Sequence, residues 1–222
     1  MSGVGGTSTP HAPRGSTPAR VAAFDFDGTL TRRDTLLPFL VHVAGRLAVG
    51  RALAAQAGPL ARALCGRGDR GAVKEQVLGP LLAGRPLAEL EALAELFADD
   101  AVARRLRPAM VRRLRAHLAA GDPVVVVTAS PELAVAPIAR RLGPVAVLGT
   151  RLEVAEDGRL TGRLTGANLR GAEKVRRLTE WLGDGGSTLH WAYGDSPGDR
   201  ELLAAAAEPL WVGRRRHGRP AG

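Results

Sequence analysis

Short apolar runs, each followed at once by polar residues, recur along the chain. Val124–Val127 is four valines in a row before Thr128, and similar runs occur at Val21–Phe26 and Leu189–Tyr193. A run that is apolar on both faces is typical of a strand buried inside a parallel sheet. Because parallel strands need long crossover connections, usually helices, the chain is predicted to be an α/β protein.

The segments between these runs have helical spacing or turn chemistry. From about residue 35 to residue 118 no strand pattern occurs, and Leu36, Leu40, Val43 and Leu47 recur at helical spacing. Further elements are expected as helices at Glu132–Leu142, Gly171–Leu182 and Asp199–Ala206, strands at Val145–Leu148 and Leu210–Val212, and a hairpin of Arg151–Ala155 with Arg159–Leu164. This order predicts a parallel Rossmann-like sheet with flanking helices and an all-helical cap inserted after the first strand.

The same patterns divide the chain into parts. Residues 1–20 are rich in Gly, Ser, Thr and Pro and are expected to be a disordered tail without the apolar core of a secretory signal. Residues 21–32 and 120–213 are expected to form the core, and residues 33–119 the cap and a connecting helix. Residues 214–222 are expected to be a basic tail.

The positive net charge of the chain does not by itself indicate a nucleic-acid or membrane partner. The formal net charge is +9, but the basic residues are scattered and few aromatic residues accompany them, so no nucleic-acid partner is expected. Membrane association is compatible with the charge but is not required by it, and no run approaches the ~18 apolar residues of a membrane span. Cys65 is the single cysteine and is expected to be a buried or half-buried thiol; a reducing cytoplasm fits this usage.

Polar residues with catalytic chemistry follow the predicted strands. Asp25 and Asp27 end the first run and are followed by Gly28, while Thr128 follows the valines and Asp195 follows the third run. Ligands of open parallel sheets bind at the carboxyl ends of the strands, so these side chains are expected around one crevice. Paired carboxylates at such a crevice suit a hard cation such as Mg²⁺ and acid–base work on a phosphate ester.

Four motifs in this order resemble the haloacid dehalogenase superfamily. The motifs are Phe24–Leu30 (FDFDGTL), the valine strand ending in Thr128, Lys174 within Gly171–Lys174, and the acidic stretch Gly194–Asp199. The helical insertion resembles the small cap of the phosphoserine-phosphatase-like branch. Dehalogenases of the superfamily act on carbon and do not have an aspartate at the position of Asp27, so its presence favours phosphoryl transfer.

The resemblance implies a Mg²⁺-dependent hydrolysis of a small phosphorylated substrate. Asp25 is the expected nucleophile and Asp27 the expected acid and base. Phosphoryl oxygens are expected to bind Thr128, the backbone at Ala129, and Lys174. The expected metal ligands are Asp25, Asp27 through its carbonyl, Asp195 and Asp199.

Several alternatives stay open. Asp34 either contacts the substrate or caps the first cap helix, and Asp195 and Asp199 could be turn and cap residues. Lys174 could be an exposed helix residue paired with a neighbour. The substrate could be phosphoserine or a phospholipid headgroup of the phosphatidylglycerophosphate type, although Gly28 and Gly198 depart from the phosphoserine enzymes. A protein of another class, an inactive one that only binds phosphate or other anions, is the remaining alternative.

Overall fold

The structure is a computed structural model, and it describes residues 19–65 and 68–213. The predicted basic tail and most of the predicted N-terminal tail lie outside these residues. The predicted boundary of the N-terminal tail at residue 20 was wrong, because Arg20 already belongs to the first strand, where it pairs with Thr188.

A sheet with strand order β4-β3-β2-β1-β5-β6 forms the centre of the molecule. Its strands are β1 (Arg20–Phe24), β2 (Val124–Pro131), β3 (Val145–Val154), β4 (Leu160–Thr165), β5 (Thr188–Gly194) and β6 (Glu208–Trp211). All neighbouring strands pair in parallel except β3 and β4, which are antiparallel. The predicted α/β fold with a parallel sheet is therefore confirmed.

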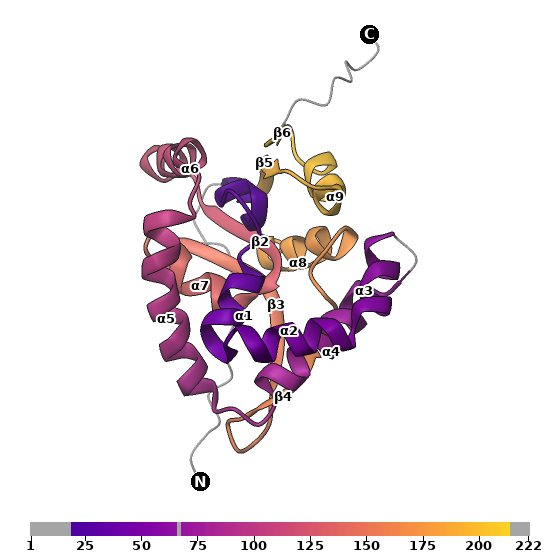
Figure 1. The fold of residues 1–222 in the computed structure, drawn as a ribbon. Coiled ribbons are helices and arrows are strands. Elements are labelled where there is room, and N and C mark those ends of the chain that lie inside the picture. Colours follow the sequence, from indigo (N-terminus) through magenta and orange to yellow (C-terminus); the bar gives the residue numbers. More distant parts are fainter. Residues whose placement is uncertain (1–18, 66–67, 214–222) are drawn as a thin grey trace.

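Alternate residues of the central strands enter two separate cores. In β1, Ala22 and Phe24 face one cluster, while Val21 and Ala23 face the other. The first cluster is covered by α5 (Leu87–Arg104), α6 (Pro108–Ala120) and α7 (Glu132–Arg140), and the second by α8 (Ala172–Leu182) and α9 (Arg200–Ala204). Figure 1 shows α5 and α7 on one side of the sheet and α8 and α9 on the other. Burial on both faces explains why these strands read as continuous apolar runs.

The residues between β1 and β2 are helical, as expected for an inserted cap. After the turn that follows β1 come α1 (Leu36–Ala44), α2 (Arg46–Ala55), α3 (Ala57–Leu64) and α4 (Arg70–Leu82). Helix α4 lies against β4, and α2, α3 and α4 form a lobe beside the sheet (Figure 1). Helix α5 instead contacts α7, where Glu95 pairs with Arg140 and Arg141. The insertion thus covers the sheet and also overhangs its edge.

Two local predictions were wrong. The strands predicted at Val145–Leu148 and Arg151–Ala155 are one strand, β3, whose first half pairs with β2 and whose second half pairs with β4. Gly149 lies between the two predicted strands, and a Cβ there would lie 2.8 Å from the Cα of Glu132, so glycine lets the strand pass the start of α7. Cys65 is exposed rather than buried.

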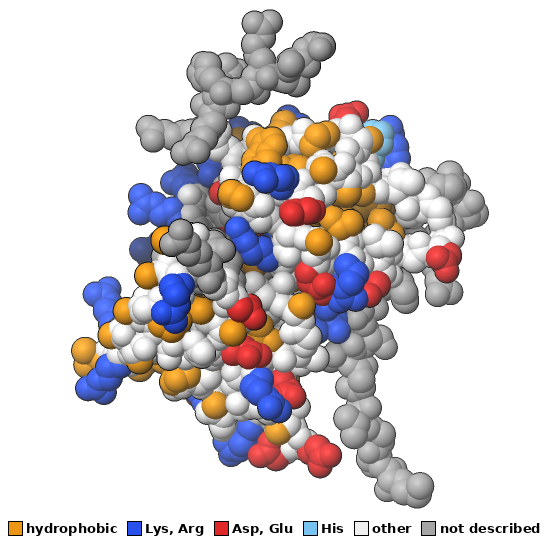
Figure 2. Space-filling model, turned by 90° about the vertical axis from the view of Figure 1, so that its right-hand side faces the viewer, with side chains coloured by type: hydrophobic (Ala, Val, Ile, Leu, Met, Phe, Trp, Pro, Cys, Tyr) orange, Lys and Arg blue, Asp and Glu red, His pale blue; other side chains and the backbone are white. Residues whose placement is uncertain are grey.

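The surface carries interspersed charges. Figure 2 shows Lys and Arg side chains alternating with Asp and Glu side chains over one face, with apolar side chains between them. Arg176, for example, forms ion pairs with Glu173 and Glu180 on α8. Among the described helices, none combines the length and the apolar character that crossing a bilayer would require.

Close contact between the cap and the sheet generates a stability prediction. Gly162 of β4 has φ 86°, and a Cβ there would lie 2.8 Å from the Cα of Gly79 in α4. We expect Gly162→Ala to lower the free energy of unfolding by about 2–4 kcal/mol, through backbone strain and overpacking together. Gly158→Ala is the matched control, because Gly158 has φ 79° but no atom within 4 Å of its added Cβ. Equal losses in urea unfolding of the two variants would contradict a tight contact between the cap and the sheet.

Candidate active site

The polar residues that follow the strands meet at the carboxyl edge of three neighbouring strands. Asp25 follows β1, Thr128 lies in β2, and Asp195 follows β5. The backbone N–H of Asp25 donates to the carbonyl of Tyr193 at 2.8 Å, which fixes the end of β1 against β5. The crevice expected from the sequence is a cavity of about 400 Å³ that all three of these residues line.

The chain turns sharply directly after Asp25. Gly28 has φ 84°, and the N–H of Thr31 donates back to the carbonyl of Phe26 at 3.0 Å. Arg107, at the start of α6, donates to the carbonyl of Gly28 at 2.9 Å and holds the turn from outside. A side chain at position 28 would also run into the carboxylate of Asp195, since an added Cβ would lie 2.1 Å from its Oδ2. Position 28 therefore requires glycine, because its φ is positive and because the Asp195 carboxylate leaves no room for a Cβ.

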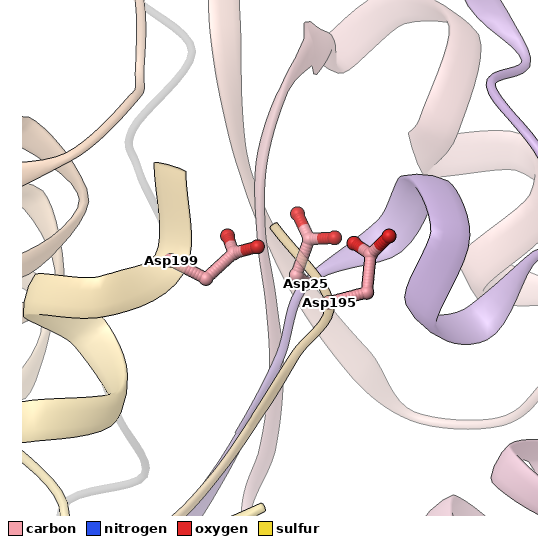
Figure 3. A group of neighbouring side chains, drawn as sticks. All are labelled: Asp25, Asp195 and Asp199. Atoms are coloured by element: carbon pink, nitrogen blue, oxygen red, sulfur yellow. The ribbon is translucent and has the colours of Figure 1, made fainter. Parts of the chain in front are cut away.

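Three carboxylates come together beside this turn. Figure 3 shows Asp25 between Asp195 and Asp199, with Asp25 on the segment from β1 and the other two on the segment after β5. One carboxylate oxygen from each lies within 4.8 Å of the others. Among the residues described, this is the one group of acidic, histidine or cysteine side chains placed to share a metal ion.

Lys174 joins two of these carboxylates. Its Nζ donates to Oδ1 of Asp25 and to Oδ1 of Asp199, both at 2.6 Å, and the side chain is only 2% exposed. The alternative of an exposed helix lysine is therefore wrong. Burial alone would lower the pKa of Lys174, but the charges of Asp25 and Asp199 raise it, so the ammonium stays protonated.

Asp199 is held by the loop that carries it. Its Oδ2 accepts hydrogen bonds from the N–H of Ser196 at 3.0 Å and from the Ser196 hydroxyl at 2.8 Å. These bonds belong to a capping box in which Ser196 is the N-cap and Asp199 is the third residue of the turn. At the start of α9 the Asp199 side chain makes no cap hydrogen bond, so the reading of Asp199 as an N-cap side chain is wrong. Burial opposes ionisation, yet the Lys174 ammonium and these hydrogen bonds lower the pKa of Asp199.

The pKa values of the other two carboxyl groups, Asp25 and Asp195, are raised. Burial raises the pKa of Asp25 to about 7, with Asp199 adding to the shift and Lys174 opposing it. Burial also raises the pKa of Asp195, and the charge of Asp199 adds to the effect. Three neighbouring carboxylates, of which Asp25 and Asp199 are buried, share a single ammonium and favour any further cation that can enter.

Asp27 lies in a polar pocket that sequence reasoning missed. Its Oδ1 accepts from the N–H and the hydroxyl of Thr35, each at 2.7 Å, and its Oδ2 accepts from the Ser130 hydroxyl at 2.5 Å. Burial and then the charge of Asp34 raise the pKa of Asp27, while these hydrogen bonds oppose the rise. Desolvation is thus the main cause of the raised pKa, and the charge of the neighbouring Asp25 is not among the main causes.

Thr128 and Ala129 lie on the wall of the cavity, opposite the acidic turn. The Thr128 hydroxyl accepts the N–H of Ser130 at 3.0 Å and keeps its own proton free to donate. The carbonyl of Ala129 accepts from Lys74 at 2.5 Å and from Thr150 at 2.7 Å. These bonds fix the loop after the valine strand.

Asp34 was predicted either to cap the first cap helix or to contact the substrate. Its Oδ1 accepts the N–H of Leu36 at 3.0 Å and that of Leu37 at 3.4 Å, so it caps α1. The residue nevertheless lines the same cavity as Asp25. Whether it contacts a substrate stays a prediction.

Lys74 enters the cavity from the cap. Its Nζ donates to the carbonyl of Ala129 and, at 2.6 Å, to Oδ1 of Asn168. Burial lowers the pKa of Lys74 to about 8, against the raising effect of Asp27 and Asp34. The sequence held a signal for it, because Lys74 and Lys174 are the two lysines of a chain with 31 basic residues, and both line this cavity.

Comparison with known proteins agrees with this geometry. The sequence profile of the haloacid dehalogenase-like hydrolases matches residues 22–204. The chain belongs to this family. It is 42% identical to the protein CicA of Caulobacter vibrioides over 189 residues, which cover 85% of this chain and 83% of that protein.

Two solved structures share most of the fold of this chain. A Bordetella pertussis Tohama I protein of unknown function is 33% identical, with a TM-score of 0.76 over 88% of this chain and 90% of that one. A phosphoserine phosphatase with an analogue of a phospho-aspartyl intermediate is 21% identical and has a TM-score of 0.61, covering 88% and 87% of the two chains. At that identity the second likeness shows the fold alone. The resemblance noted in the sequence is confirmed at the level of the family.

The donor set of the haloacid dehalogenase-like site fits a hard divalent cation. Asp25, Asp195 and Asp199 offer only oxygen atoms, and they lie close enough to share one ion. Mg²⁺ prefers one or two carboxylates and otherwise keeps water ligands. The exposed position of Asp195 leaves such an ion open to solvent and to a substrate.

The raised pKa of Asp25 generates a prediction on stability in the absence of metal. With a pKa of about 7 when folded and 3.8 as the ordinary value, Asp25 keeps its proton in the folded state while the unfolded state loses it. Stability from this group is therefore present below about pH 4 and is lost as the pH rises through 7. In EDTA, we expect Asp25→Asn to be more stable than the parent at pH 8 by on the order of 2–4 kcal/mol.

The measurement is urea unfolding at pH 5, 6, 7 and 8. In the Asp25→Asn protein the new amide oxygen can still accept from Lys174, and all other titrating groups are shared, so the difference between the two proteins isolates Asp25. An identical pH dependence of the unfolding free energy in both proteins would show that this carboxylate ionises normally.

Proposed function

We propose that this chain is a Mg²⁺-dependent phosphatase that hydrolyses a phosphate monoester of a small molecule through an aspartyl-phosphate on Asp25. The observation that carries the proposal is the buried contact of Lys174 with Asp25 in a cavity that Asp27 also lines. A nucleophile, a fixed cation and a second carboxyl group with a raised pKa are the groups that this reaction needs.

The metal would be held by the carboxylates of Asp25, Asp195 and Asp199, with the carbonyl of Asp27 as a further oxygen. When bound, Mg²⁺ would neutralise negative charge on the phosphate and orient it for attack. The remaining steps fall to side chains. Lys174 keeps a fixed positive charge beside Asp25, and Thr128 has a hydroxyl proton free to donate to a phosphoryl oxygen.

In the first step a carboxylate oxygen of Asp25 attacks phosphorus while the bond from phosphorus to the leaving oxygen breaks. Asp27 gives its proton to that oxygen, so an alcohol leaves and Asp27 becomes a carboxylate. Burial raises the pKa of Asp27, which favours the protonated form that this step requires. Thr35 and Ser130 hold its two oxygens in place.

In the second step the ionised Asp27 takes a proton from water. The resulting hydroxide attacks phosphorus, the bond to Asp25 breaks, and inorganic phosphate leaves. Asp27 is then protonated again and Asp25 is again a carboxylate. Phosphate monoesters are favoured over carbon substrates because Asp27 is positioned as an acid, a group that dehalogenation does not use.

Phosphoserine gains no special support as substrate. Oδ1 of Asp34 accepts two backbone N–H groups of α1, which is the cap role of this residue and not a contact with a substrate. Gly28, where the phosphoserine enzymes usually carry Ser, is required here by its positive φ and by Asp195. We therefore propose a phosphate monoester of a small molecule as the substrate, and we expect the cap to determine which leaving group binds.

The proposal predicts a metal-dependent activity that two aspartates carry. With p-nitrophenyl phosphate and Mg²⁺ the parent should release p-nitrophenol, and EDTA should abolish the release. Asp25→Asn should show no turnover, and Asp27→Asn should lose about 10²–10⁴-fold in kcat. The control is Asp157→Asn in the exposed β3–β4 turn, which should match the parent. An Asp25→Asn protein as active as the parent would rule out the nucleophile.

The Ser130 contact predicts a shift in the pH profile. The Ser130 hydroxyl stabilises the ionised form of Asp27, so removing it should raise the pKa of Asp27 further. Because step one needs the protonated form, the alkaline limb of kcat in Ser130→Ala should move upward by about one pH unit. Ser187→Ala, outside the cavity, is the control. An unchanged limb would mean that Asp27 does not supply the proton.

A further inference from the structure

A second cavity lies inside the cap, against the catalytic one. It has a volume of about 300 Å³ and shares Asp34, Leu36 and Lys74 with the cavity that holds Asp25. The rest of its wall comes from α1 to α4 and includes Leu40, Leu53, Leu60, Val73, Val77 and Leu78. The two cavities therefore meet at the start of α1 and at Lys74.

The wall of this cavity is aliphatic. Leu and Val line it, no aromatic side chain of the described residues does, and its charged residues Asp34 and Lys74 are those at the boundary with the catalytic cavity. Leu40, Val73 and Val77 are buried, whereas Leu37, which also lines the cavity, is 45% exposed, so the cap shelters part of this surface from bulk water. Apolar surface that faces an open cavity gains free energy when an apolar group fills it.

We infer that the substrate is a phosphate monoester whose leaving alcohol carries a single aliphatic arm, and that this arm lies in the cap cavity. The inference rests on the proposed function, because the phosphate must lie at Asp25 for the arm to point past Asp34 and Lys74. These two residues then face the polar part of the alcohol between phosphate and arm. The absence of rings in the described wall favours an aliphatic arm over a stacked aromatic one.

The size of the cavity limits the arm. About 300 Å³ holds roughly ten groups the size of a water molecule, which suits one short chain. Two long acyl chains would not fit. The cap cavity thus selects a small amphiphilic phosphate rather than a two-chain phospholipid held within it.

The test compares n-alkyl phosphates from ethyl to octyl, each below its micelle concentration, with p-nitrophenyl phosphate as the reference substrate. In the parent, kcat/KM should rise about threefold for each added methylene until the cavity is full. Leu53→Phe, which puts a ring into the wall, should reduce the ratio of octyl to ethyl activity at least tenfold. Leu53→Ala should shift the preferred length to longer chains.

Leu47→Phe and Leu47→Ala are the matched controls. Leu47 lies on the same helix, α2, is 79% exposed and does not line the cavity, so both variants should keep the chain-length profile of the parent. Circular dichroism and thermal melting establish that each variant folds. The opposite shifts expected for Leu53→Phe and Leu53→Ala cannot both come from a loss of structure.

Each outcome decides between the claims. A rise with chain length that responds to Leu53 and not to Leu47 supports the cavity as the site of the arm. A flat profile with p-nitrophenyl phosphate still hydrolysed overturns the inference and leaves the proposed function standing. A rise that Leu53→Phe leaves unchanged places the arm elsewhere and overturns it as well. If the parent hydrolyses none of these esters, both the proposed function and the inference are wrong.

Discussion

The site depends on the buried ammonium of Lys174, which lies between Asp25 and Asp199 at 2.6 Å from each. Without it, neighbouring carboxylates would face one another in a place where charge is poorly solvated. The ammonium lowers the pKa of Asp199, while Asp25, more deeply desolvated, keeps a raised pKa. The lowered pKa favours the ionised form of Asp199, and the raised pKa favours the protonated form of Asp25. A further positive charge nearby would favour loss of the proton from Asp25. A metal ion and a phosphate therefore enter a site that is only partly charge-balanced.

Much of this arrangement follows from the sequence, because strand ends are predictable. An apolar run buried on both faces indicates a strand, and parallel strands bring their carboxyl ends to one edge, which is how Asp25, Thr128 and Asp195 were placed together. The contacts of Asp27 were not predictable in this way. Ser130 is 103 residues from Asp27, and its hydroxyl reaches the carboxylate only through the close pairing of β1 with β2. Periodicity carries no information on such contacts.

The pKa of Asp27 shows why side-chain direction matters more than spacing. Asp25 and Asp27 are two residues apart, yet the charge of Asp25 is not among the main causes of the raised pKa of Asp27. The turn at Gly28 instead leaves Asp27 bonded to Thr35 and Ser130, while Asp25 bonds Lys174. Burial and Asp34 then raise the pKa of Asp27. Each aspartate has its own polar partners, which suits the proposed roles of Asp25 as nucleophile and of Asp27 as acid within a single cavity.

Core and cap contribute different parts of the chemistry. The core supplies Asp25 after β1, Lys174 on α8 and Asp199 in the segment after β5, groups that are proposed to act on the phosphate. The cap supplies Lys74, which donates a hydrogen bond to the carbonyl of Ala129 and so ties α4 to the end of β2. A leaving group in the proposed position would lie beside this bond, between a lysine and an aliphatic interior. Since the phosphate end is built by the core, differences in substrate among proteins of this fold are expected to follow the cap helices rather than the sheet.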